Sequence, residues 1–191
     1  VATDEFARQP YGKASLSKLV ARAGIAKGSV YQYFDNKLDL FSWLIESAAR
    51  MKLKFLNMPP APPPGGFFDW LEQGIAGGIR FAIAHPRLAK LSLVWLHGNE
   101  PALKQKTRRT QRIAREYTTS LLRQAQQVGE IREDIDPQVL AIMLRQTQQS
   151  VLEVLCAMTD ADSFEDLFDA EHLGQVQEED IQRVVHDVVS V

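Results

Sequence analysis

The stretch AGIAKGSVYQYF, residues 23–34, decides how the N-terminal part of this chain folds. A helical pattern precedes it, with apolar residues at the i, i+3, i+4 and i+7 positions of one helix face: Leu16, Leu19, Val20 and Ala23. Ser15 is suited to cap the start of that helix, and Gly24 to end it in a left-handed conformation. A second short helix is predicted over residues 27–34. Two short helices joined by a tight turn that contains glycine form a helix-turn-helix.

In a helix-turn-helix, the second helix enters the major groove of DNA and reads base edges with its N-terminal residues. The side chains there suit contacts with bases or phosphates, and the glycine leaves room for a close backbone approach: Lys27, Gly28, Ser29, Tyr31 and Gln32. We assign Tyr33 to a phosphate contact and Phe34 to the core, and we expect Ile25 to fill the angle between the helices. The same shape also occurs as a plain packing unit, so the motif alone leaves both interpretations open.

The length and the charge of the chain limit the number of domains and the kinds of partner that it can have. The 191 residues suffice for one large domain or two smaller ones, and 45% hydrophobic with 24% charged residues is typical of a soluble globular protein. The net charge of -2 hides an asymmetry, because residues 1–54 hold nine Lys/Arg and five Asp/Glu while the remainder is at -6. A basic segment on an acidic chain indicates a local contact with a polyanion. A difference of +4 is also small enough to arise by chance.

Helical spacing continues almost to the C-terminus. A third helix is expected after Asn36, with Asp39 completing its cap, and it extends to about residue 56. Five prolines and two glycines make residues 57–66 a connector. Pro101 begins a long helix that reaches about residue 128, and Asp136 caps the next one. With no alternating strand pattern, the chain is predicted to be all-α, with about nine helices.

Several classes of chemistry are not expected. Cys156 is the only cysteine, so no internal disulfide forms and a reducing cytoplasm is the expected location. No apolar run reaches 18 residues, which excludes a membrane-spanning helix. The four histidines do not lie at metal-ligand spacing from one another or from Cys156, and no glycine motif for phosphate follows a strand. We therefore expect no cofactor, no metal and no enzymatic activity.

Residues 15–41, SLSKLVARAGIAKGSVYQYFDNKLDLF, resemble the DNA-binding domain of TetR-type transcriptional regulators. The shared features are a Ser/Thr-capped helix, Ala-Gly, a small apolar residue, Lys-Gly, a Ser/Thr, Tyr-x-x-Phe, a lysine three residues later and then a leucine. They occur here at fixed spacing without gaps, and the resemblance extends over roughly residues 2–48.

This resemblance implies an N-terminal three-helix DNA-binding domain over residues 1–48, its first helix truncated, and a C-terminal helical bundle over residues 49–191 for ligand binding and dimerisation. It adds Ser15, Lys18 and Lys37 to the expected DNA contacts, although Lys18 is equally well explained as a surface lysine. A small-molecule effector is implied inside the C-terminal helices, and a homodimer through the last two long ones. The effector candidates, each of which core packing also explains, are Trp70, Phe81, Trp95, Tyr117, Met143 and Gln146.

The resulting hypothesis is a repressor that an effector releases from operator DNA. The alternatives are an activator of the same fold, and a helical ligand-binding protein that no longer binds DNA. One departure from the family concerns residue 26, where a Ser or Thr usually caps the second motif helix. Ala26 has no side chain that caps, and a lost cap costs about 0.5–2 kcal/mol.

Overall fold

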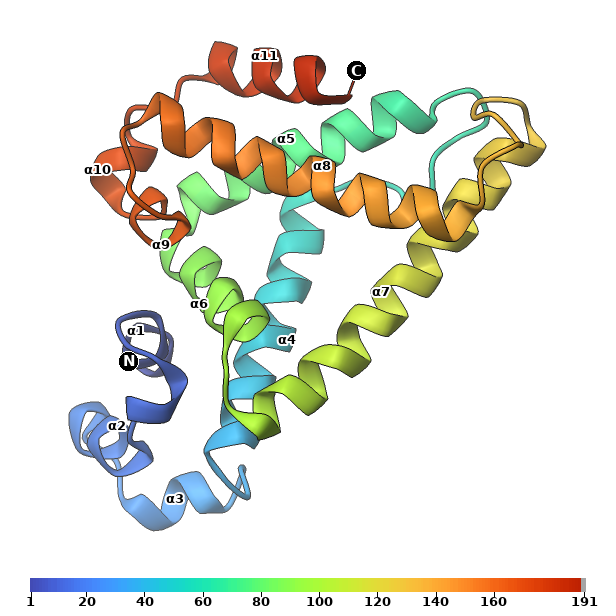
Figure 1. Ribbon diagram of the computed structural model, residues 1–191. Coiled ribbons are helices and arrows are strands. Elements are labelled where there is room, and N and C mark those ends of the chain that lie inside the picture. Colours follow the sequence, from blue (N-terminus) through green and yellow to red (C-terminus); the bar gives the residue numbers. More distant parts are fainter. Residues whose placement is uncertain (190–191) are drawn as a thin grey trace.

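The computed structural model describes residues 1–189, with every side chain in that range except those of Lys27, His97 and Ala170 (Figure 1). Its elements in chain order are α1 (Ala2–Ala7), the 3-10 turn η1 (Tyr11–Lys13), α2 (Leu16–Ala23), α3 (Lys27–Tyr31), α4 (Lys37–Leu56), α5 (Phe67–Ala84), α6 (Pro86–His97), α7 (Pro101–Gln127), α8 (Pro137–Met158), α9 (Phe164–Leu167), α10 (Ala170–Leu173) and α11 (Glu178–Val189). No strand occurs in residues 1–189, so the predicted all-α class is confirmed. Over the same range, no helix combines the length and apolar character needed to cross a membrane.

Local capping explains where the N-terminal helices begin and end. The Ser15 hydroxyl accepts from the Lys18 backbone N–H at 3.4 Å, and the Asn36 side chain accepts from the Asp39 N–H at 3.0 Å. Gly24 ends α2 at φ 67°, a conformation that a residue with a Cβ adopts only at a cost. Each of these caps depends on residues within four positions of one another, which is why the sequence alone predicts where these helices begin and end.

Two parts of the chain differ from what the sequence predicted. The recognition helix α3 ends at Tyr31 instead of residue 34, because the chain turns there and both Tyr33 N–H and Phe34 N–H bond to the Val30 carbonyl, at 3.1 and 3.0 Å. The segment after α8 forms three helices, α9 to α11, so residues 1–189 contain eleven α-helices instead of about nine. Two of these three helices, α9 and α10, have only four residues each.

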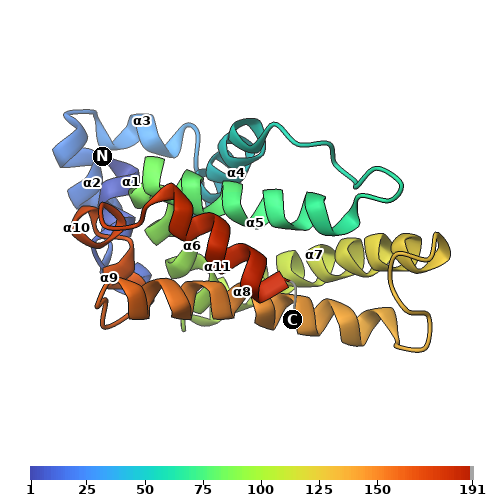
Figure 2. The same ribbon diagram turned by 90° about the horizontal axis from the view of Figure 1, so that it is seen from above.

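The helices form an open triangular frame (Figure 1). α4 rises from the N-terminal helices into the body of the molecule, where its C-terminal half packs on α5. α7 starts beside the beginning of α4 and diverges from it, then packs along α8. α11 lies across α5 and α8, as the view from above shows (Figure 2). The end that carries α3 therefore lies opposite the end that carries α8 and α11.

One hydrophobic core joins the N-terminal helices to the body. Phe41 of α4 is fully buried, with ring centroids 4.8 Å from Phe6, 5.1 Å from Tyr11 and 5.9 Å from Trp95. Leu91, from the middle of α6, and Leu103, from the start of α7, also belong to this cluster. The core beneath the helix-turn-helix therefore extends beyond residue 48, and the domain boundary there stays a prediction.

Two glycines in α5 let α4 approach closely. A Cβ on Gly77 would stand 2.5 Å from a methyl of Leu56, and one on Gly78 would stand 3.3 Å from the Lys52 ammonium. A larger residue at position 77 would force the Leu56 side chain to shift. Gly77 and Gly78 of the GIAGG stretch, residues 74–78, thus serve close helix packing.

Candidate nucleic-acid interface

The helix α3 lies at one end of the molecule (Figure 1), and its described polar side chains are exposed. Its Val30 is buried against the N-terminal core, which orients the helix. The remaining predicted contact residues of this segment are all exposed, Tyr33 by 78%: Gly28, Ser29, Tyr31, Gln32 and Tyr33. Lys27 begins α3, but its side chain lies outside the described residues. The structure thus brings the predicted reading surface together on one exposed face.

Packing behind α3 differs in part from the expectation. Phe34 is half-buried against the N-terminal core and meets the Trp43 ring edge-on at 5.8 Å, as a core residue should. Ile25 does not fill the angle between the helices, because its side chain is 47% exposed. Ala26 precedes α3 without any side-chain cap, so Val30 and Phe34 have to hold the helix start through packing.

A buried carboxylate fixes α1 on α2. Glu5 is buried, and its Oε2 accepts from Arg22 Nη1 at 2.7 Å while its Oε1 accepts from Gln9 Nε2. Removing one partner of a buried ion pair is strongly destabilising, because the other charge stays desolvated. The pair therefore locks the orientation of the helix that carries Ser15 and Lys18.

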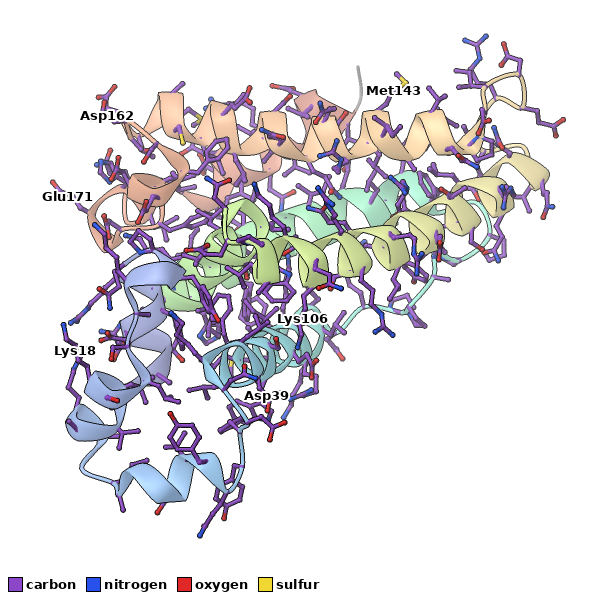
Figure 3. The ribbon with its side chains drawn as sticks, turned by 60° about the horizontal axis from the view of Figure 1, so that its bottom comes forward. Lys18, Asp39, Lys106, Met143, Asp162 and Glu171 are labelled. Carbon is purple, nitrogen blue, oxygen red and sulfur yellow. The ribbon has the colours of Figure 1, made fainter. Side chains whose placement is uncertain are left out.

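The remaining predicted contacts fall into two groups. Ser15 is half-buried as the cap of α2, whereas Lys18 is exposed on the same helix (Figure 3). Among the described residues, Lys18 has no hydrogen bond or ion pair from its ammonium. That position is free for a phosphate.

Lys37 makes several contacts within the fold, and its predicted contact with DNA stays a prediction. Its ammonium donates to the carbonyls of Tyr11 at 2.8 Å and Ala14 at 3.0 Å, with a longer contact to Gly12 at 3.4 Å. It also lies 4.3 Å from the centroid of the Tyr11 ring, a cation–π distance. Burial, and then the Glu100 carboxylate, raise the pKa of Tyr11. Since an ammonium has three hydrogens, these carbonyl contacts occupy the donors of Lys37 and hold η1 against α4.

Two of the six predicted effector residues meet at the proline connector. Trp70 of α5 donates its indole N–H to the Pro59 carbonyl at 3.0 Å, and the Tyr117 hydroxyl of α7 donates to the Pro60 carbonyl. Both side chains thereby tie the segment after α4 to the surrounding helices.

The other four candidates lie apart from one another. Phe81 is buried beside Phe55 and His85, and Trp95 is buried in the N-terminal core. Met143 and Gln146 are exposed on the outer face of α8, where Figure 3 shows Met143 pointing away from the molecule. The structure therefore does not gather the six residues into one cavity.

A groove of about 850 Å³ lies between α1, α6 and α9, and none of the six candidates lines it. Ion pairs border it: Arg87 with Asp4 at 3.1 Å, and Lys90 with Asp169 at 2.5 Å. Throughout the described part of the chain, no three His, Cys, Asp or Glu side chains are grouped as metal ligands would be.

The sequence reasoning overlooked the charge of α7. Residues 101–127 hold seven Lys/Arg and one Glu, a net charge of +6, whereas residues 128–191 hold three Arg and fifteen Asp/Glu, a net charge of -12. Summing the charge over everything after residue 54 concealed this contrast. A helix-by-helix sum would have revealed it.

Comparison with known proteins agrees with this geometry. The family model described as "Bacterial regulatory proteins, tetR family" matches residues 1–43, which contain the helix-turn-helix. The N-terminal part of this chain is therefore a TetR-family DNA-binding domain. Members of that family are DNA-binding regulators, in agreement with the expectation that this protein is not an enzyme.

Other similarities extend over most of the chain. The HTH-type transcriptional repressor AcnR of Corynebacterium diphtheriae is 23% identical over 170 residues, which is 86% of this chain and 82% of AcnR. A TetR family transcriptional regulator from Chloroflexus aurantiacus has a TM-score of 0.72 at 27% identity, with 99% of this chain and 86% of that one covered. FadR from Bacillus subtilis, in complex with stearoyl-CoA, has a TM-score of 0.66 at 21% identity, with 93% and 95% covered.

Replacing Lys37 separates a structural role in this TetR protein from a phosphate contact. We expect Lys37→Met to lower the free energy of unfolding by about 2 kcal/mol, because it removes a charge-assisted donor from several backbone carbonyls. Urea unfolding followed by circular dichroism measures the change.

Lys18→Met is the matched control, since its exposed ammonium has no partner and we expect a loss within about 0.5 kcal/mol. If Lys37→Met unfolds like the wild type but weakens the salt dependence of DNA binding, Lys37 contacts phosphate and the structural assignment is wrong.

Proposed function

We propose that this TetR protein is a repressor that binds operator DNA through α3 and is released by a small-molecule effector. The observation that carries the proposal is the exposed polar face of α3, held on a core that α4, α6 and α7 share. A recognition surface on rigid support can read base edges in the major groove without rearranging first. AcnR is named as a repressor, which favours repression over activation.

Changing two side chains of the reading face tests this proposal. A short duplex is selected by the wild-type protein from a random-sequence pool, and its dissociation constant is then measured by fluorescence anisotropy. We expect Tyr31→Ala with Gln32→Ala to weaken binding to the selected duplex by about tenfold or more, since each lost base contact costs about 1–3 kcal/mol.

The control is the exposed pair Gln175→Ala with Gln177→Ala, in the loop before α11. We expect it to bind like the wild type. If no sequence is enriched, or if the α3 variant binds as tightly as the wild type while staying folded, the proposal is wrong.

We place the effector in the opening between α4 and α7. The two helices are tied at both ends of this opening, where Lys106 Nζ donates to Ser42 Oγ at 3.0 Å and the Tyr117 hydroxyl donates to Pro60. Between these ties in the sequence lie exposed apolar side chains, Leu53 on α4 and Ile113 on α7. Exposed apolar side chains between two helices that are held apart provide a surface for an apolar ligand.

Lys52 gives this opening a cation. Its stem is exposed, but its ammonium lies against Gly78 of α5, and burial lowers the pKa of Lys52. No carboxylate pairs with it among the described residues. An anionic group of a ligand would satisfy this charge, so an apolar molecule with an anionic end fits the site best.

A long acyl chain linked to coenzyme A has this chemistry. FadR from Bacillus subtilis is described in complex with stearoyl-CoA, and FadR from Bacillus halodurans is described as a fatty acid degradation regulator. A ligand that binds between α4 and α7 would shift α4 and weaken DNA binding, and DNA would weaken ligand binding by the same factor.

Stearoyl-CoA tests the effector class directly. We expect it to dissociate the protein from the selected duplex at micromolar concentration, and Lys52→Met to raise the required concentration by about tenfold, equivalent to about 1.4 kcal/mol. Lys54→Met, on the opposite face of α4, is the matched control and should respond like the wild type. Release by coenzyme A alone, or no release by the acyl thioester, would contradict this effector assignment.

We also propose a homodimer through α8. Its exposed face carries an apolar stripe over five turns: Val139, Ile142, Met143, Val154 and Met158. α11 contributes less than the resemblance implied, since its apolar residues are buried inside the protomer and its exposed face is polar. An uncovered apolar stripe of this length on a helix is typical of an interface between identical subunits.

A charge placed in the stripe should separate the subunits. We expect the double variant Ile142→Glu and Met143→Glu to sediment as a monomer at micromolar concentration, where the wild type sediments as a dimer. Val128→Glu alters an exposed valine outside the stripe and should leave the dimer intact. A wild type that sediments at the monomer mass would refute the dimer.

A further inference from the structure

The basic charge of α7 is concentrated at the end nearest the helix-turn-helix. Lys104, Arg108 and Arg109 are exposed, and none of them has an ion pair or hydrogen bond from its side chain among the described residues. Farther along the helix, Arg112 is compensated by Glu116 at 3.8 Å. Three unpaired cations in two turns of helix form a strongly positive surface. Their charged groups make no contact that stabilises the protomer.

Several contacts hold this end of α7 against the DNA-binding unit. Lys106 bonds to Ser42 in the second turn of α4, and Figure 3 shows Lys106 next to the α4 end that carries Asp39. Leu103 is buried in the N-terminal core, and the Glu100 carboxylate accepts from the Gly12 N–H at 2.7 Å. The three cations therefore lie on a support that is rigidly joined to α2 and α3.

The face that Lys104 and Arg108 occupy differs from the effector face. Lys106 and Tyr117, eleven residues apart, both contact the α4 side, so they define the face of α7 that borders the opening. Lys104 and Arg108 lie two positions from Lys106, on the opposite side of the helix, whereas Arg109 lies three positions from Lys106, nearer the face that borders the opening. The effector opening therefore does not account for Lys104 and Arg108.

The distribution of charge over the described part of the molecule favours one orientation of the protein toward DNA. The acidic segment 128–189 lies away from α3, where Figure 3 shows Asp162 and Glu171, although Glu165 and Asp169 of α9 border the groove beside α1. A polyanion repels that segment and attracts the end with α3 and the start of α7. The protein would thus approach DNA with its recognition helix first.

We propose that Lys104, Arg108 and Arg109 form a second DNA-binding surface, which contacts backbone phosphates next to the groove that α3 enters. The proposal rests on the proposed operator binding. Because phosphate contacts carry no sequence information, this surface adds affinity and orientation and leaves the choice of bases to α3.

Salt dependence tests the proposal. The triple variant Lys104→Gln, Arg108→Gln and Arg109→Gln is titrated with the duplex selected by the wild type, between about 50 and 200 mM salt. Since each phosphate contact contributes about 0.9 to the slope of log K against log salt, we expect a slope shallower by about 1–3 and binding at least about tenfold weaker at the lowest salt. The preferred sequence should not change.

The matched control removes three exposed arginines from the far end of the molecule: Arg123→Gln, Arg132→Gln and Arg145→Gln. It changes the net charge equally and should keep the wild-type slope. If the α7 variant keeps that slope, or if the control loses as much, the second surface does not exist, although wild-type operator binding would still stand. Failure of the wild type to select any sequence would instead refute the proposed function.

The single variant Arg108→Gln keeps the test decisive if the triple variant does not fold, and circular dichroism verifies the helix content of both variants. We expect its slope to fall by about 1. A single variant that retains the wild-type slope while the triple variant is unfolded would also overturn the proposal.

Discussion

The burial of Phe41 against Phe6, Tyr11 and Trp95 is the contact on which the rest of this structure depends. Its rings come from α1, η1, α4 and α6, and Leu103 adds the start of α7. A helix-turn-helix of three short helices has little apolar surface of its own, so it needs this additional packing to hold one orientation. The consequence is that the DNA-reading helix cannot move independently of α6 and α7.

This shared core gives α4 its role as the connection between the two ends. At its start, α4 is held by Phe41 in the core and by Lys106 through Ser42. At its end, the small residues of α5 hold Leu56 and Lys52 in close contact. A ligand that widened the opening between α4 and α7 would have to strain one of these two attachments. Closely packed contacts of this kind transmit small displacements because they cannot be compressed further.

Electrostatics complements the packing. The basic start of α7 and the basic N-terminal residues lie at the end that carries α3, and most of the acidic segment 128–189 lies away from it. Within this distribution, individual charges have different functions. Lys37 and the pair of Glu5 with Arg22 are used internally to hold the fold, whereas Lys18 and the three α7 cations have no internal partner. The absence of an internal partner, more than the charge itself, distinguishes the residues that are available to DNA.

The sequence by itself determined the all-α class and most helix boundaries, and it predicted which residues of α3 are exposed to read DNA. Ser15, Asn36 and Asp136 cap their helices as predicted, because a cap depends on residues two or three positions away. Only the tertiary structure decided the role of Lys37, whose acceptors lie 23 to 26 residues away, and the place of Trp95 in the N-terminal core. It also decided that Met143 faces outward. Burial and partner choice depend on segments that are distant in sequence, and helical spacing within one segment contains no information about which distant segment covers which face.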